Sequence, residues 1–191
     1  LHVHGYWTIN ETKMSKSVGN VVEPLAMLEK YGINAFRYFL LREMQFGLDA
    51  SFSEQALVGR LNADLANDLG NLFNRALAMT HKYFKGQVPE PGESGVEDLV
   101  YIGIWQDCLT IYIEQFEQLK FAQALETLWT IIRGLNKYID SNAPWVLFKN
   151  QQSARLSTVM FIVLEGMRKT ALCLWPVMPE GSEAMLAQLG T

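Results

Sequence analysis

The sequence predicts a mainly α-helical protein in which an antiparallel helix bundle follows a small strand–helix segment. Apolar residues recur at helical spacing in four long stretches, residues 53–84, 96–119, 121–141 and 154–174. Connections containing Gly or Pro separate most of these stretches. Strict alternation of apolar and polar residues appears only in residues 1 to about 12, where it predicts a half-buried strand. Long amphipathic helices with short connections pack antiparallel, because each must bury an apolar stripe against the others.

Two short helices are expected after the first loop. Pro24 is a favourable first helical residue, and Gly32 fits the left-handed end of a helix that closes at Tyr31. Asn34 is expected to cap the next helix. Residues 49–53 form a polar break before the bundle.

The long helix of the bundle is expected to begin at a Ser53 cap and to end near Phe84, before Gly86. Its predicted buried face is Leu61, Leu65, Leu69, Leu72, Phe73, Ala76 and Thr80. The helix over residues 96–119 is expected to bury Ile104, Cys108, Ile111 and Phe116. The helix over residues 121–141 is expected to bury Leu125, Leu128, Ile132, Leu135 and Ile139. The helix over residues 154–174 is expected to bury Val159, Ile162, Val163, Leu164, Met167 and Leu172. Three tryptophans inside helical stretches are also predicted to lie in the core, Trp105, Trp129 and Trp175. A short helix from Ser182 to Leu189 closes the chain.

The composition narrows the class of protein. Among 191 residues, 49 % are hydrophobic, which supports a sizeable core, yet no apolar run is long enough to cross a bilayer and no signal peptide opens the chain. A formal net charge of −4 argues against indiscriminate nucleic-acid binding. Cys108 and Cys173 are far apart and are expected to be free thiols. The chain has no Cys-x-x-Cys pair, so we expect no zinc site and no metal in these residues.

A donor-rich loop is the first candidate site. Lys13, Met14, Ser15, Lys16 and Ser17 are consecutive, and Gly19 lets the chain turn tightly behind them. Ammonium groups, hydroxyls and free backbone N–H groups suit phosphate oxygens. From these residue types alone, an ordinary solvated surface loop is the alternative and the commoner case.

The polar face of the long helix is the second candidate. Asn71 and Arg75 lie four residues apart, one turn from each other, and together could pair with the edge of an exposed base. Trp145 follows Pro144 where a helix must end, and an aromatic ring there could stack on an unpaired base. The alternatives are an ordinary solvated helix face and a tryptophan packed between helices.

The loop and its surroundings resemble the second signature of the class I aminoacyl-tRNA synthetases. The string KMSKS stands within an extended run from Gly5 to Pro24, and similarity continues at Tyr31-Gly32 and Ala35-Phe36-Arg37. That context is similar to the subgroup that charges methionine, leucine, isoleucine, valine and cysteine. The helical part is most similar to the methionyl-tRNA synthetase family, through the run from Ala66 to Arg75 and through Ala143-Pro144-Trp145.

The resemblance implies a role for each site residue. Residues 1–52 would hold the KMSKS loop and the stem-contact segment at the end of a catalytic domain, and residues 53–191 would be the helical anticodon-binding domain. Asn71, Arg75 and Trp145 match the positions that read the anticodon CAU. The ATP-binding residues would be Lys13, Met14, Ser15, Lys16 and Ser17, with Lys13 and Lys16 acting in catalysis.

The resemblance also implies the wider function. The complete enzyme would activate methionine with ATP and Mg²⁺ and transfer it to tRNA(Met) in the cytoplasm, without contacting a membrane. We expect this chain to be a C-terminal part of that enzyme, inactive alone, with a possible homodimer through an extension after Thr191. Isoleucyl-, valyl- or leucyl-tRNA synthetase, or a non-catalytic tRNA-binding module, are the alternatives.

Overall fold

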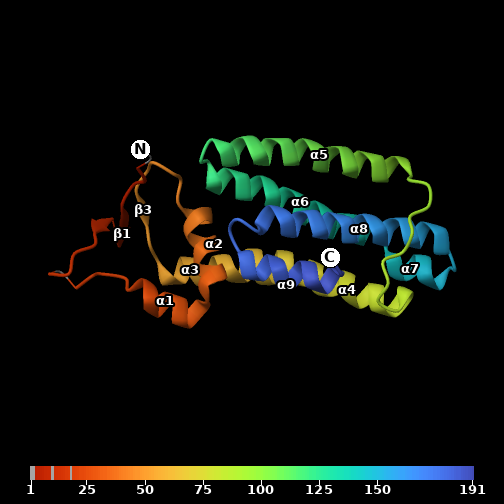
Figure 1. Cartoon of the computed structure of the whole chain (residues 1–191), viewed down its shortest axis with the longest axis horizontal. Helices are drawn as coiled ribbons and strands as arrows, with labels where there is room; N and C mark the ends of the chain where they lie inside the picture. The colour runs from red at the N-terminus through yellow and green to blue at the C-terminus, as the bar shows by residue number, and fades with distance from the viewer. Residues whose placement is uncertain (1–2, 10, 18) are drawn as a thin grey trace.

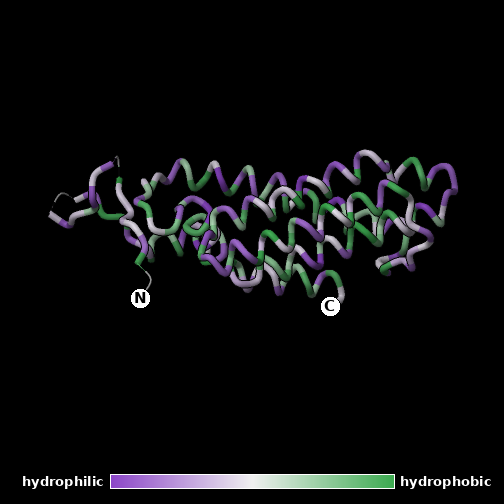
Figure 2. The backbone as a smooth tube through the Cα atoms, turned by 90° about the horizontal axis from the view of Figure 1, so that it is seen from above, coloured by the Kyte–Doolittle hydropathy of each residue, from purple (hydrophilic) through white to green (hydrophobic). Residues whose placement is uncertain are grey.

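The computed structural model describes residues 3–9, 11–17 and 19–191. The molecule is elongated, with a small strand–helix unit at one end of a bundle of long helices (Figure 1). Hydropathy alternates along each helix, as expected for helices that bury one side (Figure 2). The predicted fold class is confirmed.

A three-stranded sheet opens the chain. Its order is β2-β1-β3, in which β1 (Trp7–Ile9) pairs antiparallel with β2 (Thr12–Lys13) and parallel with β3 (Ala50–Ser51). The expected single strand is therefore shorter and turns back at Glu11, although Leu1, His2 and Asn10 of the predicted range lie outside the described residues. The interpretation of residues 49–53 as only a polar break was wrong. A two-residue strand has no periodicity of its own, and its pairing with β1 is a tertiary contact.

Two short helices follow, α1 (Pro24–Tyr31) and α2 (Ile33–Glu43), as predicted. Gly32 between them has a φ of +79°, but its ψ of 155° is extended rather than left-handed helical. The predicted Asn34 cap was wrong, because Gly32 occupies the cap position. The Asn34 amide instead donates to Glu180 Oε2 at 3.0 Å and accepts from the Gly181 N–H at 3.3 Å, near the far end of the chain.

The predicted long helix is present, but its middle is wound differently. It consists of α3 (Glu54–Arg60), a π-helical segment η1 (Leu61–Gly70) and α4 (Asn71–Phe84). Ser53 caps it as expected, because its Oγ accepts from the Ala56 N–H. Apolar spacing predicted one helix here and gave no sign of the wider turns.

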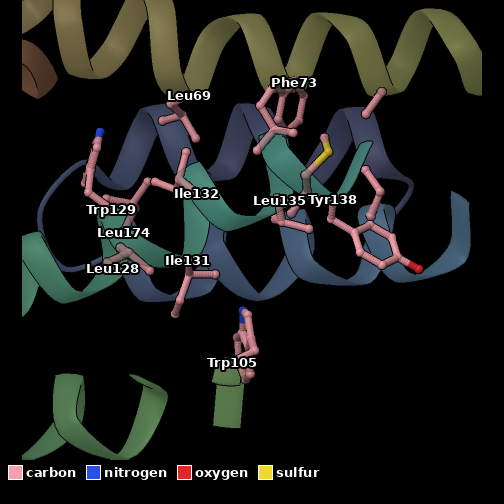
Figure 3. Close-up of a cluster of buried hydrophobic side chains, with 14 of the residues drawn as sticks. Leu69, Phe73, Trp105, Leu128, Trp129, Ile131, Ile132, Leu135, Tyr138 and Leu174 are labelled. Carbon is pink, nitrogen blue, oxygen red and sulfur yellow. The ribbon is translucent and has the colours of Figure 1, made fainter. Parts of the chain in front are cut away.

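The rest of the bundle comprises α5 (Val96–Glu117), α6 (Phe121–Asn142) and α8 (Ser153–Leu174), with α9 (Pro179–Leu189) closing it. A further short helix, α7 (Pro144–Lys149), stands where only an end of α6 was predicted. The main core lies around α6, whose predicted buried residues are all fully buried. Figure 3 shows Leu69 and Phe73 of the long helix pointing toward Ile132 and Leu135 of α6.

Four predicted core residues lie at the surface instead. Ile104 and Ile111 are 50 % and 45 % exposed, while Trp105 and Tyr112 are the buried aromatic residues of α5. Leu172 and Trp175 are about half exposed as well. Residues 96–113 are apolar on nearly every side, so spacing could not select which face is buried.

A second, smaller core holds the N-terminal unit together. It consists of the buried residues Phe36, Phe39, Phe52 and Leu57, with Trp7 and Met14 packed against it. Tyr38 of α2 belongs to the main core, where its ring lies 4.8 Å from that of Trp129. Arg37 adds a second link by donating to the carbonyls of Pro176 and Val177. Helix α2 therefore joins the two cores. None of the described helices is long and apolar enough to cross a membrane.

Candidate functional site

The loop of Lys13–Ser17 forms a closed turn at the end of β2. Asn20 closes it, because its Oδ1 accepts from the Ser15 N–H at 2.8 Å and its Nδ2 donates to the Lys13 carbonyl at 3.3 Å. Gly19, with a φ of +71°, donates its N–H to the Ser15 carbonyl at 3.1 Å. Sequence reasoning did not single out Asn20, although a short amide side chain behind a lysine–serine loop is a known signal for such a turn.

The loop presents its polar groups and buries its apolar one. Met14 packs against the second core, whereas Lys16 and Ser17 are exposed. The Ser15 and Ser17 hydroxyls lie 2.8 Å apart, and the Lys13 ammonium lies 4.3 Å from the centroid of the Tyr6 ring. The turn therefore has a fixed base and an exposed ammonium at Lys16, which is an arrangement that can meet an anionic ligand from solvent.

The second candidate site lies on the bundle. Asn71 is the first residue of α4 and is exposed, and Arg75 follows one turn later on the same face. The guanidinium of Arg75 donates to Asp140 Oδ1 at 2.5 Å, which places it against the last turn of α6. The pair is partly exposed and can be reached by a ligand.

Trp145 lies five residues after Asp140, in α7. Ala143 has a left-handed conformation with a φ of +42°, and this turns the chain so that Pro144 begins the short helix. Trp145 is 46 % exposed, so it is not a core tryptophan buried between helices and part of its surface is open to a ligand. The structure thus places Arg75 against the last turn of α6 and Trp145 just after α6 ends, with Asn71 one turn from Arg75 on α4. The KMSKS loop lies at the other end of the molecule (Figure 1).

A buried carboxylate supports the end of α6. Asp98 is fully buried and accepts hydrogen bonds from Arg155, the Tyr138 hydroxyl and the Gly95 N–H. Arg155 also donates to Asn142, the last residue of α6. Burial alone would raise the pKa of Asp98, but the hydrogen bonds from Arg155, Tyr138 and Gly95 outweigh it, and the pKa lies below its ordinary value. Sequence reasoning missed this network, since one acidic residue in a helix has no distinguishing pattern.

The chain's own residues offer no set of metal ligands in the part that the structure describes. No three His, Cys, Asp or Glu side chains gather there where they could hold a metal ion. Cys108 and Cys173 are free and half-buried, and burial raises the pKa of the Cys173 thiol to about 11. The residues of the KMSKS loop are donors, which fit the phosphates of a nucleotide rather than a divalent cation.

Comparison with known families assigns the two parts of the chain. Residues 1–77 match the family model described as tRNA synthetases class I (M). Residues 88–191 match the model of the anticodon binding domain of methionyl tRNA ligase. The fold and the KMSKS loop are thus those of a class I aminoacyl-tRNA synthetase with a helical anticodon-binding domain. The chain belongs to the methionyl-tRNA synthetase family, as the sequence resemblance predicted.

Individual relatives agree with this assignment. The methionine–tRNA ligase of Fusobacterium nucleatum is 46 % identical over 188 residues, and that of Bacillus subtilis is 43 % identical over 189 residues. Each alignment covers 98 % of this chain but only 30 % and 28 % of the relative, respectively. A structure of Mycobacterium tuberculosis methionyl-tRNA synthetase in complex with methionyl-adenylate is 41 % identical, with a TM-score of 0.91, over 96 % of this chain and 37 % of that chain. The chain therefore spans about a third of the length of its relatives.

Proposed function

We propose that this chain supplies the ATP-handling loop and the anticodon-reading surface of a methionine–tRNA ligase. The observation that carries the proposal is the position of the partly exposed Arg75 against the last turn of α6 and of the exposed Trp145 just after it, inside a domain of the anticodon-binding family. Residues 1–52 form the end of the catalytic domain in this proposal, and residues 53–191 form the anticodon-binding domain. The two hydrophobic cores support that division, although Leu57 of α3 packs into the smaller core and Tyr38 of α2 into the main one.

The KMSKS loop acts on the pyrophosphate half of ATP. When the carboxylate of methionine attacks the α-phosphate, negative charge grows on the departing pyrophosphate. Lys16 is exposed at the turn and stabilises that charge, while Lys13 and the hydroxyls of Ser15 and Ser17 bind the phosphates as well. Met14 and Asn20 hold the turn in place. Mg²⁺ bound with ATP would neutralise phosphate charge, and the hydroxyls and ammonium groups of the loop would contact the phosphates beside it.

The bundle reads the anticodon CAU of tRNA(Met). The fixed fork of the Arg75 guanidinium and the Asn71 amide pair with base edges, and the open indole of Trp145 is a stacking platform. Stacking of one base on such a ring contributes about 1–3 kcal/mol. Asp140 holds Arg75 in a defined direction before the RNA arrives. ATP and methionine are substrates of the complete ligase, which acts in the cytoplasm.

Fluorescence of the two half-exposed tryptophans tests the anticodon assignment. We would titrate the chain with an RNA stem-loop carrying CAU and with one carrying GAU. The expected result is quenching by CAU that Trp145→Phe abolishes. Trp175→Phe is the matched control, because Trp175 is 49 % exposed, against 46 % for Trp145, and lies at the opposite end of α8 from α7. Quenching that survives Trp145→Phe, or that is equal for the two loops, would refute the assignment.

A further inference from the structure

Two segments far apart in the sequence meet beside Trp145. Tyr83, in the last turn of α4, stacks on Phe148 of α7, with ring centroids 4.5 Å apart and planes inclined by 25°. Phe148 remains 48 % exposed and lies three residues after Trp145 on the same short helix. Both helices reach this end of the bundle (Figure 1). The stack therefore fixes the end of α4 against α7 and extends the exposed aromatic surface beyond Trp145.

Exposed lysines surround the stack. Lys82, Lys85 and Lys149 are all exposed, and the Lys82 ammonium lies 5.7 Å from the centroid of the Tyr83 ring. We call Lys82, Tyr83, Lys85, Phe148 and Lys149 the lysine–aromatic patch. Within the described residues, the lysines that form ion pairs are Lys30 and Lys169, so the three lysines of the patch keep their charge uncompensated.

Acidic residues are missing from both segments of the patch. The chain contains 20 acidic and 16 basic residues, yet no Asp or Glu occurs between Asp68 and Glu90 or between Asp140 and Glu165. Asp140 is bound to Arg75. Glu90 and Glu93 lie in the loop that leaves α4, and neither forms an ion pair with a patch lysine in the part of the chain that the structure describes. A negatively charged protein thus has a locally positive surface at one end of its bundle.

We propose that the lysine–aromatic patch binds the phosphate backbone of the RNA stem-loop whose unpaired bases lie at Asn71, Arg75 and Trp145. The proposal rests on the proposed function, because the patch is continuous with Trp145 through α7. Lysine ammoniums are mobile point charges that suit phosphate oxygens, and these lysines give up no protein ion pair on binding. Phosphate contacts position a nucleic acid, whereas base contacts specify it. The patch therefore adds affinity and orientation and leaves the choice of anticodon to the three residues beside it.

Salt dependence of RNA binding tests this division. The triple variant Lys82→Gln, Lys85→Gln, Lys149→Gln would be compared with the unchanged chain for binding of the CAU and GAU stem-loops at 50 and 200 mM salt. Each lysine that no longer neutralises a phosphate of single-stranded RNA lowers the slope of log affinity against log salt by about 0.7. For three such lysines, the affinity of the unchanged chain should fall about 20-fold further than that of the variant over this salt range. The ratio of CAU to GAU affinity should not change.

The control is Lys120→Gln, an exposed lysine that donates to Gln118 and lies in the turn between α5 and α6 at the other end of the bundle. It should leave both affinity and slope unchanged. Circular dichroism and thermal unfolding would establish that the triple variant is folded, and Lys149→Gln alone offers a milder version with a slope change of about 0.7. If the triple variant keeps the affinity and the salt slope of the unchanged chain and still prefers CAU, the proposal that the patch binds RNA phosphates is wrong, and the proposed anticodon reading stands. Equal binding of CAU and GAU by the unchanged chain would overturn the proposed function and the patch together.

Discussion

At the scale of single residues, the proposed anticodon surface depends on a buried carboxylate that touches none of the proposed RNA-binding residues. Asp98 holds Arg155, and Arg155 holds Asn142, the last residue of α6. The left-handed Ala143 and then Pro144 and Trp145 follow at once. A charge that is fully buried persists only where hydrogen bonds and an opposite charge compensate its desolvation. The network therefore fixes where α6 ends and where α7 begins.

Replacement of Asp98 by Asn should reduce stability in a pH-dependent way. Because the pKa of Asp98 is lowered in the folded state, its contribution is present above the unfolded value of about 3.9 and is lost as pH falls through the folded value. We expect Asp98→Asn to lower the free energy of unfolding at pH 7 by about 3 kcal/mol, the low end for a broken buried ion pair. Urea unfolding at pH 7, 4 and 2.5 measures the free energy of unfolding of the variant and of the unchanged chain. The difference between the two free energies should become smaller as the pH falls.

The control for this experiment is Glu97→Gln, which removes an exposed acidic side chain one position earlier on the same helix. It should change the free energy of unfolding by less than about 0.5 kcal/mol. A constant difference between Asp98→Asn and the unchanged chain at all three pH values would show that the carboxylate charge is not what stabilises this end of α6.

At the scale of elements, the sequence predicted helices well where the apolar stripe was narrow. All five predicted core positions of α6 are fully buried, because polar residues flank them on every turn. In α5, Ile104 and Ile111 were wrongly placed, because apolar residues occur on nearly all sides and the choice of face depends on the neighbouring helices. Strand β3 and helix α7 were missed because they are too short for any period to appear. Of the site, the roles of the loop residues and of Asn71, Arg75 and Trp145 came from motif resemblance. Asp98 and Asp140 act through tertiary contacts that a sequence pattern does not show, and Asn20 acts through local hydrogen bonds within the loop.

The π-helical segment gives a prediction at this scale. A Cβ on Gly70 would lie 2.9 Å from the Leu65 carbonyl oxygen, which is a backbone atom that cannot move without altering the wide turn. Gly70→Ala should therefore lower the free energy of unfolding, by about 1–3 kcal/mol. Gly59→Ala in α3, where a Cβ would meet nothing within 4 Å, should raise it by about 0.5–1 kcal/mol, as alanine normally does in a helix.

Chemical denaturation of the two alanine variants provides the measurement. We expect the free energy of unfolding to fall for Gly70→Ala and to rise for Gly59→Ala, although both are the same substitution in one continuous helix. If Gly70→Ala stabilises the chain as Gly59→Ala does, the helix passes residue 70 with ordinary α-helical turns and the tight contact with Leu65 is absent.

At the scale of the whole molecule, the two candidate sites lie at opposite ends of one framework. The KMSKS loop packs through Met14 on the smaller core, and the proposed anticodon surface lies at the other end of the molecule (Figure 1). Helix α2 belongs to both, through Phe39 on one side and Tyr38 on the other. The Arg37 bonds to the carbonyls of Pro176 and Val177 tie that helix to the end of α8. The two sites are therefore connected through helix α2, by side-chain packing on both cores and by the hydrogen bonds of Arg37.

The most direct test of this account is the ratio of the dissociation constants of the GAU and CAU stem-loops for the chain, measured at one fixed salt concentration. We expect CAU to bind at least tenfold more tightly, corresponding to about 1.4 kcal/mol, and Arg75→Ala to bring the ratio close to one. Equal dissociation constants for the two loops in the unchanged chain would contradict it, because the RNA would then be held through its phosphates alone.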